Sequence, residues 1–207
     1  MAVADADYRF TYVDVGTNGR VSDRGVFSQS SLFPSLQDGR LNLPAATKRN
    51  GTDDDIPFFF IGDDAFPLRP DLMKPYPQRN LDQEQRIYNY HLCRSRRIIE
   101  NAFGILSHRF RVFLTTIQLA PEVAEQVVLA GCVLHNLLRT QSCAAYVPPV
   151  LVDVEESSHA VQTGYWRREH QLIPLAATRG RNATTDAKHV RELLKAYFNS
   201  ANGSVPW

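Results

Sequence analysis

Residues 56–61, with the sequence IPFFFI, constrain the fold more than any other stretch of this chain. The run is unbroken, apolar and of strand length, and it ends at Gly62 and two adjacent carboxylates, Asp63 and Asp64. A strand that is apolar on both faces is typical of the middle of a covered sheet. The pattern therefore predicts a sheet with helices packed on it, as in α/β proteins.

Hydrophobic periodicity predicts the other elements. Residues 8–15, YRFTYVDV, are rich in aromatic and β-branched side chains and are typical of a strand. Ser22 or Asp23 is suited to cap a short helix, and residues 37–55 have the composition of a loop. The longest helix is predicted from Asp82 to about Phe113, with one apolar stripe formed by Tyr88, Leu92, Ile99, Phe103, Leu106 and Phe110.

Helices and a strand are also predicted in the second half of the chain. A strand is predicted around residues 113–119, followed by a helix that starts at Pro121 and is apolar nearly all round, hence buried. Residues 142–171 are expected to form an irregular, exposed connector, and residues 186–199 an amphipathic helix. We therefore expect a domain over residues 1–141, with a connector and helix over residues 142–207.

Charge is unevenly distributed, although the formal net charge of the 207 residues is only +1. Acidic residues crowd the segment before the long helix, and arginines crowd the helix itself, at positions 86, 94, 96, 97, 109 and 111. Such asymmetry can mark a surface that binds a polyanion, and a solvated helix face is the alternative.

The three cysteines form no CxxC motif, which favours a reducing compartment without a disulfide framework. His91 with Cys93, and Cys132 with His135, match no common zinc spacing, and we expect both pairs to be buried structural residues. No apolar stretch approaches the length of a membrane-spanning helix, so no membrane partner is expected.

The carboxylates after residues 56–61 admit two interpretations. A buried strand delivers its last residues to the carboxyl edge of the sheet, where open α/β folds bind ligands. A divalent cation is one partner that a carboxylate can find there, and two metals can hold the attacking and leaving oxygens of a phosphodiester exchange. The alternative is that Asp63 and Asp64 are ordinary turn residues before Pro67.

Glu100 favours the metal interpretation. It lies within the arginine-rich helix, with Arg96 and Arg97 one turn before it and Gly104 one turn after it. The arginines can lower the pKa of the carboxylate and contact phosphate, and Gly104 leaves room for something to approach the same helix face. The alternative is an ordinary intrahelical pair between Glu100 and an arginine.

Four segments together resemble the DDE endonuclease domain of PIF/Harbinger transposases and of the genes derived from them. They are VDVGTNGRVSDRGVF, IGDDAFPL, YNYHLCRSRRIIENAFGILSHRFRVF and VLHNLLR, with further similarity in GYWRRE, RGRN and SVPW. The resemblance implies an RNase H-like mixed sheet flanked by helices and an acidic triad that binds two Mg²⁺ or Mn²⁺ ions. Metal-dependent hydrolysis and strand transfer of DNA are the implied activities.

The resemblance also implies roles for individual residues. Asp63 and Glu100 correspond to the second and third acids of the triad, as catalytic residues and metal ligands. Arg94, Arg96, Arg97 and Arg109 would bind DNA. A nuclear protein that also occurs in the cytoplasm is implied, with a Myb-like protein as a partner and no small-molecule substrate.

The sequence departs from the family pattern at its start. The first strand, most of the second strand and the first acid of the triad have no counterpart here, and Asp23 matches a position that we interpret as a helix cap. With two of three triad acids, we expect impaired catalysis. The alternative is an inactive, domesticated transposase that binds DNA or a partner protein.

Overall fold

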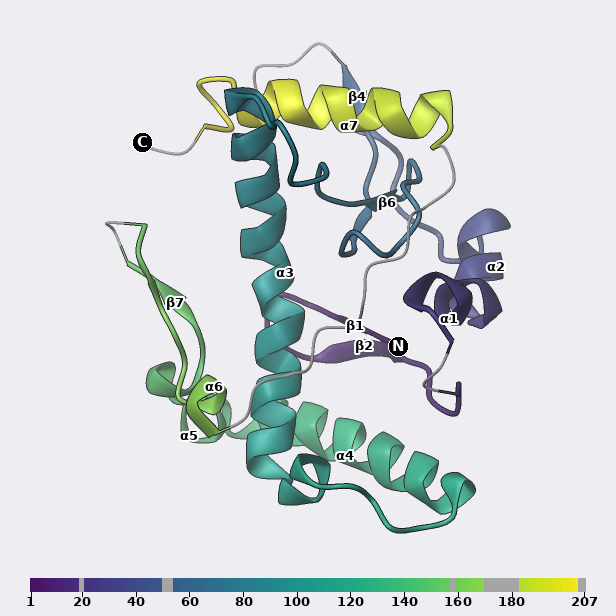
Figure 1. The fold of residues 1–207 in the computed structure, drawn as a ribbon, viewed down its shortest axis with the longest axis vertical. Coiled ribbons are helices and arrows are strands. Elements are labelled where there is room, and N and C mark those ends of the chain that lie inside the picture. Colours follow the sequence, from purple (N-terminus) through teal and green to yellow (C-terminus); the bar gives the residue numbers. More distant parts are fainter. Residues whose placement is uncertain (19–20, 50–53, 157–158, 170–182, 205–207) are drawn as a thin grey trace. The chain divides into compact units, whose positions relative to one another are not determined.

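The structure is a computed structural model that describes residues 1–18, 21–49, 54–156, 159–169 and 183–204. The chain divides into two compact units, each made of two segments. The first unit comprises Met1–Asn18 and Arg97–Leu175, and the second comprises Gly19–Arg96 and Ala176–Trp207. The long helix α3 (Gln83–Arg109) contributes its first part to the second unit and its last part to the first unit (Figure 1).

The first unit begins with a hairpin. Strand β1 (Ala2–Ala4) pairs antiparallel with β2 (Phe10–Val13), and a register shift separates Val3 from Ala4. Residues 10–13 confirm the strand predicted around residues 8–15. The rest of the unit, beyond α3, consists of η1 (Arg111–Leu114), α4 (Pro121–Gln141), α5 (Cys143–Tyr146), η2 (Pro149–Leu151), β7 (Val154–Glu155), β8 (Val161–Gln162) and α6 (Trp166–Glu169).

Helix α4 holds the hairpin by side-chain hydrogen bonds. Asn136 Oδ1 accepts from the Phe10 N–H at 2.9 Å, and Asn136 Nδ2 donates to the Phe10 carbonyl at 2.8 Å. One amide side chain thus satisfies the backbone of Phe10 on the edge of β2 that has no neighbouring strand among the described residues. His135 Nε2 contacts the Tyr8 carbonyl at 2.7 Å and helps to hold Tyr8 at a φ of 64°, which residues other than glycine rarely adopt.

His135 is fully buried in this arrangement, with 0% of its surface exposed. Its Nδ1 lies 3.0 Å from the Tyr146 hydroxyl. Because the Tyr8 carbonyl can only accept, Nε2 carries the proton and Nδ1 accepts from Tyr146. Burial lowers the pKa of His135 and outweighs the hydrogen bond to Tyr8, which raises it. The neutral imidazole is therefore the form that the fold requires.

We expect acid to destabilise the protein through His135. Its pKa in the folded chain lies below the value of about 6.5 for an unfolded chain, so the unfolded state binds more protons in this range. The contribution is complete above pH ~6.5 and is lost as the pH falls, by at most ~1.4 kcal/mol per pH unit. Urea unfolding from pH ~7.5 to ~5 measures it. His135→Gln, whose amide can both donate to Tyr8 and accept from Tyr146, should show a smaller loss; equal slopes would contradict the assignment.

Two buried clusters form the core of the first unit. One gathers Phe10, Ala102, Leu106 and Cys132 between the hairpin, α3 and α4. The other gathers Ile105, Tyr146, Val147, Leu151, Val152 and Trp166. Residues 142–171 were expected to be irregular and exposed. That expectation was wrong for the members of this cluster, which are buried together with Ile105 of α3, whereas Val150, Val154, Val161 and Tyr165 are exposed.

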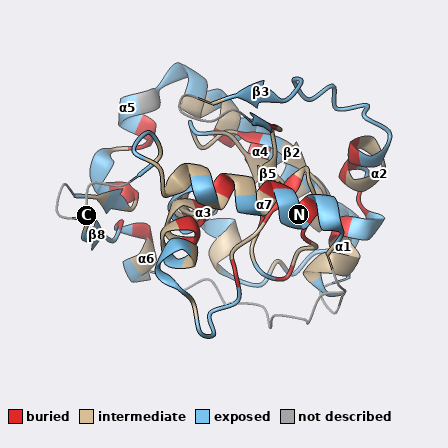
Figure 2. Ribbon diagram, turned by 90° about the horizontal axis from the view of Figure 1, so that it is seen from above, coloured by how far each residue is buried: buried red, intermediate tan, exposed pale blue. Residues whose placement is uncertain are grey.

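Helix α4 confirms the predicted start at Pro121 but not the predicted burial. Gly131, Cys132 and His135 are buried, whereas Val133 is 67% exposed and Leu134 and Leu137 are also exposed. The helix therefore packs along one face, and apolar residues occupy part of its open face as well. Figure 2 shows the buried and exposed residues of each element in separate colours.

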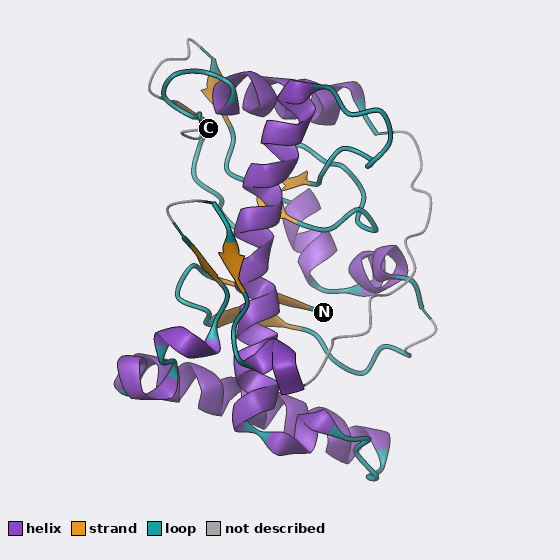
Figure 3. Ribbon diagram, turned by 60° about the vertical axis from the view of Figure 1, so that its left-hand side comes forward, coloured by secondary structure: helices purple, strands orange, loops and turns teal. Residues whose placement is uncertain are grey.

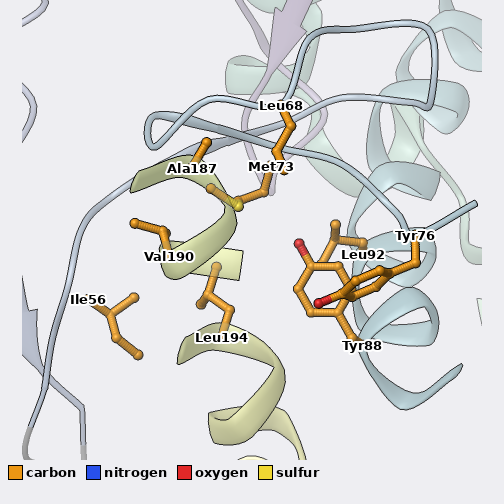
Figure 4. Packing of buried hydrophobic residues seen from close by; sticks show 9 residues of the cluster. All are labelled: Ile56, Leu68, Met73, Tyr76, Tyr88, Leu92, Ala187, Val190 and Leu194. Atoms are coloured by element: carbon orange, nitrogen blue, oxygen red, sulfur yellow. The ribbon is translucent and has the colours of Figure 1, made fainter. Parts of the chain in front are cut away.

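The second unit contains α1 (Asp23–Gln29), α2 (Leu32–Gln37), α7 (Thr185–Phe198) and two small pairs of strands. Strand β3 (Thr47–Lys48) pairs antiparallel with β4 (Asp55–Ile56), and β5 (Phe60–Ile61) pairs in parallel with β6 (Leu72–Met73). The predicted helix over residues 186–199 is confirmed by α7. The core of the second unit is formed by Ile56, Leu68, Met73, Tyr76, Tyr88, Leu92, Ala187, Val190 and Leu194 (Figure 4).

Two sequence predictions of strands need correction. Residues 56–61 do not form one covered strand: Ile56 belongs to β4, Phe60 and Ile61 belong to β5, and the residues between them are in neither. Pro57 lacks an N–H and cannot continue a ladder of hydrogen bonds. Residues 113–119 contain no strand, since η1 ends at Leu114 and the following residues have no strand partner.

The secondary structure places the chain in the mixed α/β class, as predicted (Figure 3). The described residues form four two-stranded sheets. The larger RNase H-like sheet implied by the resemblance stays a prediction.

Candidate functional site at the β5–β6 edge

The parallel pair β5–β6 defines an edge at which two polar residues emerge. Phe60 pairs with Leu72 and Ile61 pairs with Met73. The Gly62 N–H then donates to the Met73 carbonyl at 2.9 Å and extends the ladder by one step. Parallel strands end at the same edge of a sheet, and ligands of open α/β folds bind at that edge. Asp63 follows β5 there, and Lys74 follows β6.

Asp63 is held in a turn. Its Oδ1 accepts from the Ala65 N–H at 2.9 Å, which is the local bond by which aspartate stabilises turns. A Cβ at Gly62 would lie 3.0 Å from the ring of Phe66, so a larger residue there would require Phe66 to shift by a few tenths of an ångström. Asp63 is half-buried, and Asp64 is exposed. This bond confirms that Asp63 is a turn residue, and its role as a metal ligand stays a prediction.

Asp23 is a third acid near this edge. Ser22 caps α1 by accepting from the Gly25 N–H at 3.3 Å, so the cap that we assigned to either residue belongs to Ser22. Asp23 lies one turn before Phe27, whose ring packs edge-on against Phe66 at a centroid distance of 5.8 Å. Burial raises the pKa of Asp23, and the negative charge of Asp63 raises it further.

Glu100 lies in the first unit and has an arginine partner far along the chain. Arg167 Nη2 donates to Glu100 Oε2 at 2.7 Å. The same guanidinium contacts both carboxylate oxygens of Asp153 at 2.6–2.9 Å, and the Asp153 side chain is 1% exposed. Hydrogen bonds to Asp153 first, and to Glu100 next, raise the pKa of Arg167 against the effect of burial. The charge of Glu100 is therefore compensated by Arg167, a partner outside its own helix.

The predicted DNA-binding arginines differ in their surroundings. Arg97 pairs with Glu155, whose side chain is buried. Arg109 donates through Nε to the Tyr146 carbonyl at 3.0 Å and lies over the Tyr146 ring. Arg94 is exposed and Arg96 is half-buried. Arg97 and Arg109 thus have structural contacts that hold residues 143–155, while contact of any of the four with DNA stays a prediction.

Gly104 leaves room on α3, as the sequence indicated. A side chain of the protein itself, Trp166, occupies that room. A Cβ at Gly104 would lie 2.2 Å from the indole of Trp166. Trp166 Nε1 donates to Asn101 Oδ1 at 3.0 Å, and Arg167 stacks over the indole ring at 4.3 Å. The glycine therefore serves the packing of α6 on α3.

The predicted site residues fall in different units. Asp63 belongs to the second unit and Glu100 to the first, so their convergence on one ion stays a prediction. Among the described residues, no group of three or more histidine, cysteine or acidic side chains is arranged to hold a metal ion. Of the proposed structural cysteines, Cys132 is buried, but Cys93 is exposed, which corrects its expected burial. No helix in the described ranges is long and apolar enough to cross a membrane.

Comparison with known proteins agrees with the family resemblance in the sequence. Residues 1–136 match the family described as DDE superfamily endonuclease. The chain is 27% identical over 143 residues to "Protein ALP1-like" of Arabidopsis thaliana, covering 66% of this chain and 34% of the relative. It is 29% identical over 155 residues to "Putative nuclease HARBI1" of Homo sapiens, covering 72% and 40%. It is 28% identical over 159 residues to the protein of that name in Bos taurus, covering 75% and 41%.

The matches span 34–41% of the length of these curated relatives. No solved structure matches the chain.

Proposed function

We propose, from the premise that this chain belongs to the DDE superfamily endonuclease family, that it takes part in metal-dependent cleavage of DNA. Asp63 is the residue that we assign to the reaction centre, at the carboxyl edge of β5–β6. The observation that carries the proposal is the parallel register of these strands, which brings Asp63 and Lys74 to one edge within the residues that match the family.

Two acids near this edge have the chemistry that a hard cation prefers. Asp63 is half-buried, and the pKa of Asp23 is raised by burial first and by the charge of Asp63 second. Carboxylate oxygens are the protein ligands that magnesium and manganese favour. When bound, such an ion would stabilise charge on a phosphodiester and activate water. Among the described residues, no third histidine, cysteine or acidic side chain completes such a site.

The residues of the chain would orient the DNA and hold the charge of the ion. Asp63 is restrained by its bond to the Ala65 N–H and presents its carboxylate at a rigid strand end. Rigid placement of this kind reduces the entropy that a reacting complex must lose. Glu100 would enter the site only with a rearrangement of its bond to Arg167. A DNA substrate also leads us to propose a nuclear location, with DNA binding by the exposed face of α3 that carries Arg94.

A non-enzymatic role in binding DNA or a partner protein is the second candidate. The pairing of Glu100 with Arg167 favours it, because a carboxylate that is already neutralised gains less from a cation. A Myb-like partner would belong to this candidate.

Nicking of supercoiled plasmid in Mn²⁺ tests the first candidate. We expect the unsubstituted chain to nick DNA with Mn²⁺ and not with EDTA, and Asp63→Asn to reduce nicking to the level of the metal-free reaction. Asp64→Asn is the matched control, since Asp64 is the exposed neighbour of the same residue type. Its activity should be retained. Nicking that survives in Asp63→Asn rejects the assigned residue, and DNA binding without nicking by the unsubstituted chain favours the second candidate.

A further inference from the structure

Lys74 emerges at the same edge as Asp63. It follows β6 directly, as Gly62 and Asp63 follow β5, and the bond from the Gly62 N–H to the Met73 carbonyl keeps the two chains side by side up to this point. The Lys74 carbonyl accepts weakly from the Tyr88 hydroxyl at 3.4 Å, and this contact ties the lysine backbone to α3. The position of the lysine is thus set by a strand register and by the core of the second unit.

The ammonium group lies among acids without forming an ion pair. Nζ donates to the Asp64 carbonyl at 2.8 Å, and no carboxylate of the described residues lies within ion-pair distance of it. Burial lowers the pKa of Lys74, while the charges of Asp64 and Asp63 raise it and the charges of Arg191 and Arg24 lower it. An ammonium has three donors, so two N–H groups remain beyond the bond to Asp64.

This placement fits the needs of a phosphate next to Asp63. A DNA backbone brought to the β5–β6 edge meets the negative charges of Asp63, Asp64 and Asp23, which repel it. A compact ammonium with free donors offsets that repulsion and binds phosphate oxygens by charge-assisted hydrogen bonds.

We propose that Lys74 binds a backbone phosphate of the DNA strand held at the β5–β6 edge. The inference rests on the proposed function and assigns a positioning role to a residue outside the acidic set and outside the arginines of α3. The alternative is that Lys74 acts within the fold alone, by holding the Asp64 carbonyl.

DNA binding without metal separates these roles. Fluorescence anisotropy of a labelled duplex in EDTA, over a range of salt concentrations, measures affinity while excluding cleavage. Loss of one phosphate contact lowers the slope of log K against log salt by about 0.9 and, at ~0.1 M salt, the affinity by roughly eight-fold. We expect this change in Lys74→Gln. Lys74→Arg keeps the charge and should retain affinity within about two-fold.

Matched variants keep the test decisive. The contact from Tyr88 uses the backbone carbonyl of residue 74, so Lys74→Gln keeps it, and unfolding curves check that the fold persists. Lys188→Gln removes the same charge from an exposed position of α7 and should leave the salt slope unchanged. If Lys74→Gln behaves as Lys188→Gln, the Lys74 assignment is overturned and the proposed function stands. If the unsubstituted chain binds no DNA, the proposed function itself is overturned.

Discussion

Arg167→Met is expected to lower the free energy of unfolding by about 3 kcal/mol, the low end of the range for breaking a buried ion pair. The low end applies because the arginine side chain is 32% exposed, whereas its partner Asp153 is 1% exposed. Removal of the guanidinium leaves a buried carboxylate with the Gly164 N–H as its remaining hydrogen-bond donor among the described contacts. The cost arises from that uncompensated charge rather than from the lost attraction alone.

Urea unfolding of three variants measures this cost. Arg168→Met changes the neighbouring, exposed arginine of α6 in the same way and should change stability by less than about 0.5 kcal/mol. Asp153→Asn combined with Arg167→Met removes the buried charge and should recover part of the loss, since the amide oxygen can still accept from Gly164. Equal stability of Arg167→Met and Arg168→Met would show that the ion pairs of Arg167 make no net contribution to the free energy of unfolding.

This network also bears on Glu100. Arg167→Met removes the ion pair with Glu100, so any metal affinity that depends on Glu100 should rise even as stability falls. Isothermal titration with Mn²⁺ under conditions where the variant stays folded detects such a change.

Gly104→Ala is expected to lower the free energy of unfolding by about 2–3 kcal/mol, although alanine favours helices by about 1 kcal/mol over glycine. The new Cβ would lie 2.2–2.6 Å from three ring atoms of Trp166, a rigid side chain that is 4% exposed. Relief of this overlap requires the indole to move, which breaks its bond to Asn101 Oδ1 at 3.0 Å. Asn101 also accepts from the Asp153 N–H, so the disturbance extends to the residue that precedes β7.

Ser95→Ala on the solvent side of α3 is the control for this prediction. Its hydroxyl donates to the His91 carbonyl one turn earlier, a bond that contributes little to helix stability, and alanine should change stability by only a few tenths of a kcal/mol. Tryptophan fluorescence reports the displacement of the Trp166 indole when Trp207, the other tryptophan of the chain, is replaced by phenylalanine in every variant. A Gly104→Ala variant that is as stable as the unsubstituted chain, with unchanged Trp166 emission, would contradict the packing described here.

The sequence predicted the helices better than the strands. Helices α3, α4 and α7 were predicted to within a few residues because their periodicity and the proline at the start of α4 are local signals. Residues 56–61 and 113–119 were interpreted as strands from composition alone, but a strand exists only with a partner. Pro57 interrupts the first segment, and the second has no neighbouring strand.

The sequence likewise predicted only some features of the candidate site. Its acids were recognised from local order: a carboxylate after an apolar run, and a glutamate between arginines and a glycine. The charge partners were not, because they are distant in sequence. Glu100 binds Arg167, 67 residues away, and Arg97 binds Glu155, 58 residues away.

By itself, then, the sequence determined the family, the long helices and Asp63 as the acid of a strand end, since these depend on motifs and on spacing within one segment. The tertiary structure alone decided that Trp166 occupies the space beside Gly104, that Arg167 neutralises Glu100, and that Lys74 shares an edge with Asp63. The physical reason is that packing and ion pairing join side chains across the fold, and no periodicity along the chain encodes which distant residue arrives.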